Sequence, residues 1–226
     1  MNKKGKFIVI EGTDGSGKAT QSKLLLQRLK KQEKKVAFFD FPQYGKPTCA
    51  AVEKYLNGKY GTAQEVGPYR ASLLYAVDRY DASFKLYHWL SKGYTVIANR
   101  YVASNLAHQG GKIRDSKKRK KYFSWINNLE YKIFQIPKPD KNIILFVDAK
   151  ISQKLVDGKK NRAYLKGKRR DIHEADLNHL MQTQQVYKEL AKLYKKEFTV
   201  IQCVKNNQIM TRGEISTQID SALKKL

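Results

Sequence analysis

A glycine-rich segment at residues 12–20 carries the residue types best suited to binding phosphate. It reads Gly-Thr-Asp-Gly-Ser-Gly-Lys-Ala-Thr and lies between a short apolar run and a segment of helical period. Its glycines allow the backbone to turn tightly and bring N–H groups close to phosphate oxygens, and the N-terminus of the following helix adds partial positive charge. A lysine at this position can reach the β- and γ-phosphates of a nucleotide. The pattern predicts an ATP-binding loop made of Gly12, Thr13, Asp14, Gly15, Ser16, Gly17, Lys18, Ala19 and Thr20.

The loop departs from the usual phosphate-binding pattern at one position. Ala19 follows the lysine, where Ser or Thr normally supplies a hydroxyl to Mg²⁺. Thr20 comes one residue too late, because one residue on a helix rotates a side chain by about 100°. A glycine-rich turn without a ligand is the alternative interpretation. The order of strand, loop, lysine and helix favours the phosphate-binding loop.

Five short apolar runs alternate with longer segments of helical period along the chain. Strands are expected at residues 7–10, 36–41, 94–98, 143–147 and 198–203, and helices around 18–32, 48–58, 69–91, 116–136, 174–196 and 211–225. Nearly continuous apolar runs are typical of parallel strands that are covered on both faces. The alternation predicts an α/β fold with a doubly wound, mostly parallel five-stranded sheet and helices on both faces. Such sheets bind ligands at the carboxyl ends of their strands.

The composition indicates a single domain over residues 1–226. Apolar residues make up 41% of the chain, which suits a globular fold, and no stretch approaches the ~20 consecutive apolar residues of a membrane span. The two cysteines, Cys49 and Cys203, lie far apart and lack metal-ligand spacing. Reduced thiols and a cytoplasmic location are therefore expected.

The formal net charge of +25 favours partners that carry phosphate. Lysine supplies most of this charge and is spread along the whole chain, as expected of a basic surface exposed to solvent. A basic phosphate-loop protein that acts on nucleic acid is the alternative. The basic runs lack interleaved aromatic residues, which counts against nucleic acid as a partner.

Five segments have the order and the residues of one known family. The longest, at residues 99–110, reads Asn-Arg-Tyr-Val-Ala-Ser-Asn-Leu-Ala-His-Gln-Gly. The others are the loop at 11–21, Asp-Phe-Pro at 40–42, Leu-Leu-Tyr-Ala-Val-Asp-Arg at 73–79 and Pro-Lys-Pro-Asp at 137–140. Together they resemble the thymidylate kinases, which transfer a phosphoryl group from ATP to dTMP and give dTDP. The resemblance extends from the first strand to the final helices.

The resemblance implies a dTMP site beside the ATP-binding loop. Tyr75 and Arg79 are one helical turn apart, so the ring can stack on a base while the guanidinium donates to a base carbonyl. Arg100, at the end of the third strand, can clamp the acceptor phosphate, and Asn105 suits the N3–O4 edge of thymine. The residues expected at dTMP are Asp14, Phe41, Pro42, Tyr75, Arg79, Arg100, Ser104, Asn105, His108 and Gln109.

Structural roles remain as alternatives for three of these residues. Tyr75 could be a core aromatic, because its helix has a broad apolar face. Arg79 could pair with Asp78 or Asp81 at the surface. Asn105 could cap a helix or close a turn.

Residues 157–171 combine seven basic residues with two glycines and lack apolar periodicity, which predicts a mobile loop. In the resembling family this position is a lid that closes over ATP. The resemblance assigns the catalytic arginine to Arg169 or Arg170 and places Arg162 near the adenine. An exposed basic loop without a catalytic part is the alternative.

Phosphoryl transfer depends on positioning and charge neutralisation rather than on covalent chemistry by the protein. Mg²⁺ is the expected cofactor, with ATP as phosphoryl donor, and Asp14 is expected to reach the ion through water. The residues expected to be catalytic are Lys18, Asp14, Arg100, Arg169 and Arg170.

Four positions differ from the family pattern. Asn99 stands where the family usually has Asp, and together with Ala19 it removes a charge and a hydroxyl from the surroundings of Mg²⁺. Either ATP phosphates, Asp14 and water hold the ion, or metal use is weakened. His108 replaces the usual Tyr near the sugar, and Tyr44 stands where some members place an arginine against the acceptor phosphate. Base and sugar selectivity are therefore left open.

Two other functions remain as alternatives. One is a kinase of the same architecture for another monophosphate such as dUMP, and the other is an ATP-binding protein with little kinase activity. Members of the resembling family are homodimers joined by helices. The helix at 69–91 is apolar enough to contribute to such a dimer. Its apolar stripe consists of Leu73, Val77, Tyr80, Phe84 and Tyr87.

Overall fold

Five strands form one sheet in the order β2-β3-β1-β4-β5. They are β1 (Lys6–Gly12), β2 (Val36–Asp40), β3 (Thr95–Asn99), β4 (Lys141–Phe146) and β5 (Phe198–Gln202). The computed structural model describes residues 5–32, 34–148, 151–152, 155, 177–206 and 208–224. Each expected apolar run forms a strand and each neighbouring pair is parallel, so the predicted parallel sheet is confirmed.

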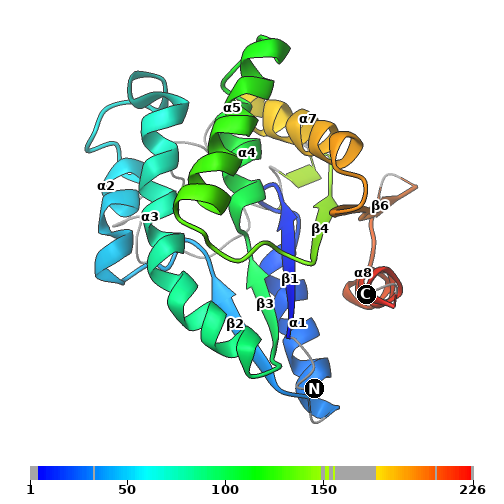
Figure 1. Ribbon diagram of the computed structural model, residues 1–226. Helices are drawn as coiled ribbons and strands as arrows, with labels where there is room; N and C mark the ends of the chain where they lie inside the picture. Colours follow the sequence, from blue (N-terminus) through cyan, green and yellow to red (C-terminus); the bar gives the residue numbers. More distant parts are fainter. Residues whose placement is uncertain are drawn as a thin grey trace.

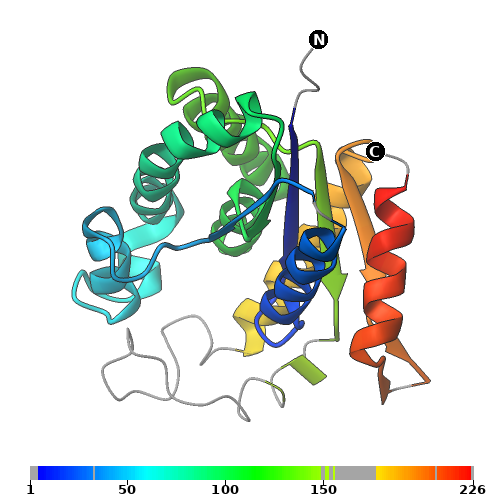
Figure 2. The same cartoon turned by 90° about the horizontal axis from the view of Figure 1, so that it is seen from below.

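Helices cover both faces of this sheet. Their bounds are α1 (Lys18–Lys31), α2 (Ala50–Leu56), α3 (Ala63–Ser91), α4 (Val102–Gly110), α5 (Ser116–Asn128), α7 (Leu177–Leu193) and α8 (Arg212–Leu223). A 3₁₀ turn, η1 (Pro47–Cys49), precedes α2, and a π-helical turn, η2 (Leu129–Ile133), follows α5. Two short antiparallel strands, β6 (Val204–Lys205) and β7 (Gln208–Ile209), precede α8. α1 and α8 pack on one face of the sheet, whereas α3, α4, α5 and α7 pack on the other (Figure 1, Figure 2).

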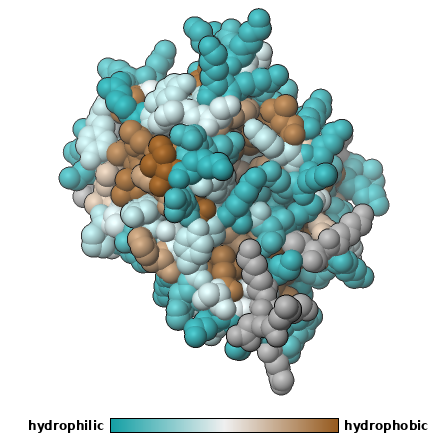
Figure 3. Space-filling model, viewed as in Figure 1, coloured by the Kyte–Doolittle hydropathy of each residue, from teal (hydrophilic) through white to brown (hydrophobic). Residues whose placement is uncertain are grey.

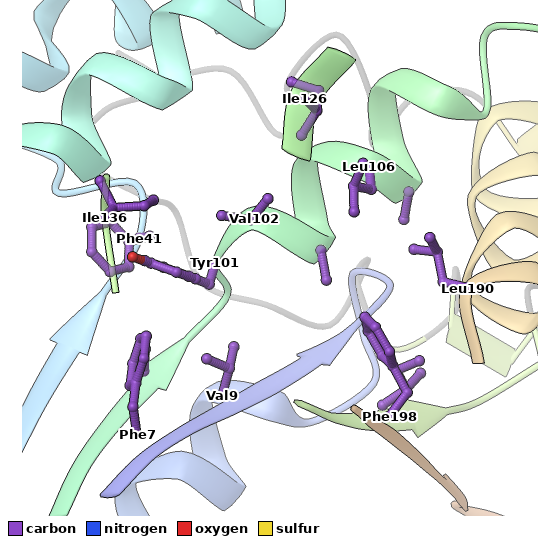
Figure 4. Packing of buried hydrophobic residues seen from close by; sticks show 14 of the residues in the cluster. Phe7, Val9, Phe41, Tyr101, Val102, Leu106, Ile126, Ile136, Leu190 and Phe198 are labelled. Carbon is purple, nitrogen blue, oxygen red and sulfur yellow. The ribbon is translucent and has the colours of Figure 1, made fainter. Parts of the chain in front are cut away.

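Side chains that alternate along β1 pack into two hydrophobic cores, one on each face of the sheet. Phe7 and Val9 point toward Tyr101 and Val102, where α4 begins (Figure 4). The rings of Phe7 and Tyr101 meet edge-on with centroids 4.9 Å apart. Full burial of a side chain of this size contributes about 1.5–3 kcal/mol. The start of α4 is therefore fixed against the strand that leads into the phosphate-binding loop.

The helix boundaries differ from expectation at α3 and α4. α3 begins six residues early, because the Thr62 hydroxyl accepts from Glu65 N at 3.2 Å and the Glu65 carboxylate accepts from Thr62 N at 2.7 Å. Gly67, with φ 73°, interrupts the helix in its first turns. Sequence periodicity does not identify α4, because eight of its nine residues are buried and no polar face is left to reveal the period.

The apolar stripe of α3 is exposed. Its five members are between 41% and 64% exposed, and Phe84 has the highest value. Ala82 and Leu86 lie on the side of α3 that packs toward the sheet. Figure 3 shows brown, apolar atoms gathered on the face where Figure 1 draws α3. The periodicity thus identified the helix but not the side that enters the core.

Both cysteines are buried free thiols. Burial raises the pKa of Cys49 and of Cys203 to about 12, so neither is a reactive thiolate at neutral pH. In the part of the chain that the structure describes, no helix has both the length and the apolar character needed to cross a membrane.

Candidate active site

A cleft of about 920 Å³ lies at the carboxyl ends of β1, β2 and β3. It brings the phosphate-binding loop together with residues of α3 and α4. The expected site residues that line it are Asp14, Gly15, Ser16, Gly17, Lys18, Ala19, Thr20, Phe41, Pro42, Tyr75, Arg79, Arg100, Ser104, Asn105, His108 and Gln109. Gly12 and Thr13 belong to the loop without lining the cleft. The expected lid, with Arg162, Arg169 and Arg170, lies outside the described residues.

The phosphate-binding loop closes around its own lysine. Lys18 Nζ donates to the Thr13 carbonyl oxygen at 2.8 Å and lies 3.5 Å from Asp14 Oδ1. Gly15 has a φ of +85°, and a Cβ at this position would lie 2.3 Å from the Ser152 carbonyl oxygen. Glycine is therefore needed at Gly15 for both its backbone conformation and the close packing. Because α1 begins at Lys18, the loop amides and the helix N-terminus form a binding place for phosphate.

Arg100 leaves β3 in a backbone conformation that is rare outside glycine, with φ 66°. Its N–H donates to the Ile10 carbonyl oxygen at 3.0 Å, which fixes the turn. Nη2 pairs with Asp14 Oδ1 at 2.5 Å, and Nη1 donates to Ser104 Oγ and His108 Nε2, each at 3.1 Å. Burial alone would lower the pKa of Arg100, but the Asp14 carboxylate, together with Tyr187, Glu11 and Tyr44, raises it overall. A charged guanidinium therefore stands beside the phosphate-binding loop.

His108 is buried between Arg100 and a second histidine. A guanidinium only donates, so His108 Nε2 accepts from Arg100 and the ring proton belongs on Nδ1. Nδ1 lies 3.3 Å from Nε2 of His179 on α7. Burial first, and the neighbouring Arg100 second, lower the pKa of His108 well below its ordinary value. The ring that lines the cleft is therefore a neutral imidazole at pH 7.

Glu11 anchors the first turn of α4 to the end of β1. Its buried carboxylate accepts from the N–H groups of Tyr101 at 2.8 Å and Ser104 at 3.1 Å. It also accepts from the hydroxyls of Ser104 at 2.6 Å and Tyr187 at 2.8 Å. Burial raises the pKa of Glu11, and these hydrogen bonds together with Arg100 oppose the rise. A carboxylate at a helix N-terminus also matches the helix dipole. The position of α4, and with it Asn105, His108 and Gln109, depends on this contact.

Tyr75 and Arg79 both line the cleft from α3. Tyr75 is half-buried against the small core beneath α2, so the core-aromatic alternative holds only in part. Arg79 is buried, and its Nε and Nη2 donate to the carboxylate of Glu130 in η2. The alternative in which Arg79 pairs at the surface with Asp78 or Asp81 is therefore wrong.

Asn105 and Gln109 lie one turn apart within α4, and both are buried. Asn105 Nδ2 donates to the Ser72 carbonyl oxygen at 3.3 Å. Asn105 Oδ1 and Gln109 Oε1 lack a hydrogen-bond partner among the described residues. A buried acceptor without a partner costs roughly 1–3 kcal/mol, so these amides are poised to accept from a ligand. The capping alternative for Asn105 is wrong, because the residue lies inside the helix.

The positions altered at the expected metal site lie at the same cleft. Asn99 Nδ2 donates to Asp40 Oδ1 at 2.7 Å, and Asn99 Oδ1 is a buried acceptor without a partner in the described part of the chain. Ala19 and Tyr44 also line the cleft. The described residues contain no group of three or more His, Cys, Asp or Glu that could hold a metal ion. The described part of the site therefore supplies few charged metal ligands.

Three residues that position this site were not identified as functional from the sequence. Glu11 had a signal, since it directly follows a buried apolar strand. Glu130 had a signal as well, because it lies four residues after Ile126 on the apolar side of the expected helix. His179 had none, because its contact with His108 depends on how α7 packs against α4.

The fold and the cleft define a P-loop nucleotide kinase, because a phosphate-binding loop and an arginine-lined pocket meet at the strand ends of a parallel sheet. The thymidylate kinase family model matches residues 10–212. A thymidylate kinase of Mycobacterium tuberculosis is 33% identical over 187 residues, which cover 82% of this chain and 85% of the relative. A probable thymidylate kinase of Methanocaldococcus jannaschii is 31% identical over 209 residues, which cover 92% of this chain and 93% of the relative. The chain belongs to the thymidylate kinase family, and the resemblance seen in its motifs is confirmed.

Solved structures support the fold independently. A thymidylate kinase structure from Candida albicans matches with a TM-score of 0.75 at 21% identity and covers 98% of this chain and 92% of that chain. A second structure, from Ehrlichia chaffeensis, matches with a TM-score of 0.68 at 21% identity and covers 97% of this chain and 99% of that chain. The family reaction is the ATP-dependent phosphorylation of dTMP to dTDP, which makes this chain an ATP-dependent nucleoside monophosphate kinase.

Proposed function

We propose that this chain binds ATP and dTMP in the one cleft and uses Arg100 to hold the acceptor phosphate in line with the γ-phosphate of ATP. The observation that carries the proposal is the contact between Arg100 Nη2 and Asp14 Oδ1, because it holds the Arg100 guanidinium beside the phosphate-binding loop. An oxygen of the dTMP phosphate attacks the γ-phosphorus, and the bond to the β–γ bridging oxygen breaks to release ADP. The attacking oxygen is already anionic at pH 7, so no general base is required.

The donor end of the cleft binds the phosphates of ATP. Lys18 and the loop amides neutralise and orient them, and Lys18 exchanges its internal contact with Thr13 for a phosphate oxygen. The residues present fit a Mg²⁺ ion that enters with ATP, since Mg²⁺ commonly keeps several waters and Asp14 can reach it through one of them. Asn99 adds a neutral amide oxygen to the same cleft. When bound, the ion offsets the negative charge of the phosphates.

The acceptor end reads the nucleoside. Tyr75 stacks on the base, Arg79 donates to a base carbonyl and Asn105 pairs with the N3–O4 edge. The neutral His108 lies toward the sugar and keeps the Arg100 guanidinium turned to the acceptor phosphate. Phe41, Pro42, Ser104 and Gln109 complete the walls of this pocket.

The lid arginines remain part of the proposal on the strength of the family resemblance. Arg169 or Arg170 is assigned to the transferring phosphoryl group and Arg162 to the adenine side. Loss of one arginine that stabilises the transition state lowers kcat by about 10³-fold or more. Single alanine variants at the two catalytic candidates identify the residue, and wild-type kcat in both would remove the lid from the mechanism.

A second copy of this chain is proposed to cover the exposed stripe of α3. Five large apolar side chains on one helix face exceed what isolated surface residues require, and Ile133 of η2 adds a further exposed one. Sedimentation equilibrium is expected to give twice the monomer mass for the wild type and the monomer mass for Phe84→Glu. A monomeric wild type would contradict the dimer.

A cytoplasmic location and a single domain over 1–226 remain proposals. Cell fractionation tests the location, and limited proteolysis tests the single domain.

A panel of acceptors tests the proposed reaction. The test measures ADP release with dTMP, dUMP, UMP and dCMP at fixed concentrations of ATP and Mg²⁺. We expect the highest kcat/KM with dTMP. A preference for dUMP would redirect the proposal to another monophosphate. The altered positions Ala19 and Asn99 favour one further candidate, an ATP-binding protein with little kinase activity. That candidate predicts ATP binding by calorimetry without ADP release for any acceptor.

A further inference from the structure

Glu130 is a fully buried carboxylate behind the acceptor end of the cleft. Both of its oxygens accept from Arg79 Nε at 3.1 Å, and Oε1 also accepts from Arg79 Nη2. The side chains of the pair are 0% and 4% exposed. Glu130 does not line the cleft, whereas Arg79 does.

A local distortion of the backbone presents Glu130 to Arg79. Phe134 N donates to the Leu129 carbonyl oxygen at 2.8 Å, five residues back, so η2 is one residue wider than an α-helical turn. Ile136 N then donates to the Glu130 carbonyl oxygen at 3.0 Å. π-helical turns of this kind occur frequently at functional sites. Here the widened turn buries the acidic residue and leaves Ile133 63% exposed.

The pairing with Glu130 fixes one edge of the Arg79 guanidinium and leaves the edge that carries Nη1 available for a ligand. Nε and Nη2 face Glu130, and Nη1 takes part in none of the hydrogen bonds between described residues. The guanidinium is planar and its donors are arranged in a rigid fork, so fixing one edge fixes the direction of the rest. Burial alone would lower the pKa of Arg79, but Glu130, together with Tyr101 and Asp78, raises it overall, which keeps the donors charged.

Stability alone is a weak reason for this pair. Replacing a buried ion pair with apolar residues of similar volume is often neutral or stabilising, because desolvation of two charges offsets their attraction. We propose that Glu130 is a positioning residue for base selection: it holds Arg79 so that Nη1 faces the pyrimidine carbonyl at position 4. This inference rests on the proposed function, in which Arg79 reads the base.

The fixed donor explains how cytosine would be rejected. Thymine and uracil present a carbonyl oxygen at position 4, whereas cytosine presents an amino group, which also donates. A guanidinium that cannot turn away is left unpaired opposite that amino group, and an unpaired buried donor is costly. If Glu130 is neutralised, Arg79 can turn, and discrimination between dTMP and dCMP decreases.

The test compares Glu130→Gln with a matched control, Glu189→Gln. Glu189 pairs with Arg119 at 2.8 Å, is largely buried and does not line the cleft. For Glu130→Gln we expect the KM for dTMP to rise about tenfold and the ratio of kcat/KM for dTMP over dCMP to fall about tenfold, as for loss of one buried hydrogen bond. The KM for ATP and all values of the control stay within about twofold of wild type.

Other outcomes separate the possible failures. A folded Glu130→Gln with wild-type KM and selectivity overturns the inference. An equal rise in the KM for ATP also overturns it, because that result marks a merely structural role. A wild type that neither releases ADP with dTMP nor binds dTMP by calorimetry overturns the proposed function itself. If Glu130→Gln does not fold, Arg79→Met/Glu130→Met removes both charges. The inference then requires that this variant select poorly between dTMP and dCMP, and wild-type selectivity contradicts it.

Discussion

The two ends of the cleft, proposed for ATP and for dTMP, are built in different ways. At the donor end, one continuous segment supplies the glycine turns, the amides and Lys18. At the acceptor end, side chains from β3, α3 and α4 converge, and each arginine is held by a carboxylate distant in sequence. Asp14 holds Arg100, and Glu130 holds Arg79. A site made from backbone is therefore local in the chain, whereas a site made from side chains needs tertiary contacts to fix its geometry.

Asp14 joins the two ends. It belongs to the donor loop, lies 3.5 Å from Lys18 and pairs with Arg100 at 2.5 Å. A carboxylate between two cations keeps them together and limits their mutual repulsion. Once nucleotides arrive, their phosphates can replace the carboxylate as partners of both cations. The comparison between the ends can be tested by damaging one end at a time.

Among the variants that separate the two ends, the largest effects are expected from the single variants Arg100→Ala and Lys18→Met. Arg100→Ala should lower kcat/KM for dTMP by about 10²–10³-fold, because a fixed cation at the transferring phosphate is lost. Its Kd for ATP should stay within about twofold of wild type. Lys18→Met should show the reverse, with weakened ATP binding and a retained Kd for dTMP. Calorimetry with each nucleotide and the coupled assay measure both variants. If both variants bind ATP and dTMP equally weakly, the two ends of the cleft are not separable.

A smaller effect is expected from Asn105→Ala, which removes only the side chain proposed to pair with the base. The variant should lower kcat/KM for dTMP about tenfold, since the N3–O4 edge of thymine loses a hydrogen-bonding partner. The KM for ATP should hardly change, and the preference for dTMP over other monophosphates should decrease. Acceptor-panel kinetics measure this. If the variant discriminates as well as the wild type, Asn105 does not read the base.

The smallest effect concerns pH and stability at the acceptor end. The pKa of His108 is held well below its ordinary value of about 6.5, so below that pH the unfolded state binds a proton that the folded state does not. Stability from the neutral ring is fully present above about pH 6.5 and is lost as pH falls below it, by at most about 1.4 kcal/mol per pH unit. Arg100, His179 and Lys18 oppose protonation of His108, and Asp14 favours it.

Melting temperatures between pH 5 and pH 8 measure this effect. His108→Gln should lose less stability than the wild type as pH falls from 7 to 5, because the variant has no imidazole to protonate there. Parallel curves for the two proteins would show that His108 is not a source of the pH dependence. Other titrating groups, Glu11 among them, are common to both proteins and cancel in the comparison.

The sequence was sufficient for the position of the phosphate-binding loop between strand and helix, and for the sheet. The loop could be predicted because its chemistry resides in glycine positions and in one lysine, all within nine residues. The five strands could be predicted because buried parallel strands are nearly continuous apolar runs. α4 escaped prediction because it is buried on nearly all sides, and the early start of α3 depends on the local cap formed by Thr62 and Glu65.

At the acceptor end, motif resemblance identified residues but not their partners. Arg79 was expected at the base, yet its pairing with Glu130, 51 positions away, depends on the widened turn of η2. The contact of His108 with His179 requires α7 to pack on α4, and no local pattern encodes it. The stripe of α3 showed the limit of periodicity, since an exposed apolar face has the same spacing as one that enters the core.

The central claim is that the acceptor phosphate binds at Arg100, in line with the phosphates held by the loop. A crystal structure with dTMP and a non-hydrolysable ATP analogue tests it most directly. We predict a phosphate oxygen of dTMP within hydrogen-bonding distance of the Arg100 guanidinium and the γ-phosphate of the analogue against Lys18. A dTMP phosphate bound away from Arg100, with both nucleotides present, would contradict it.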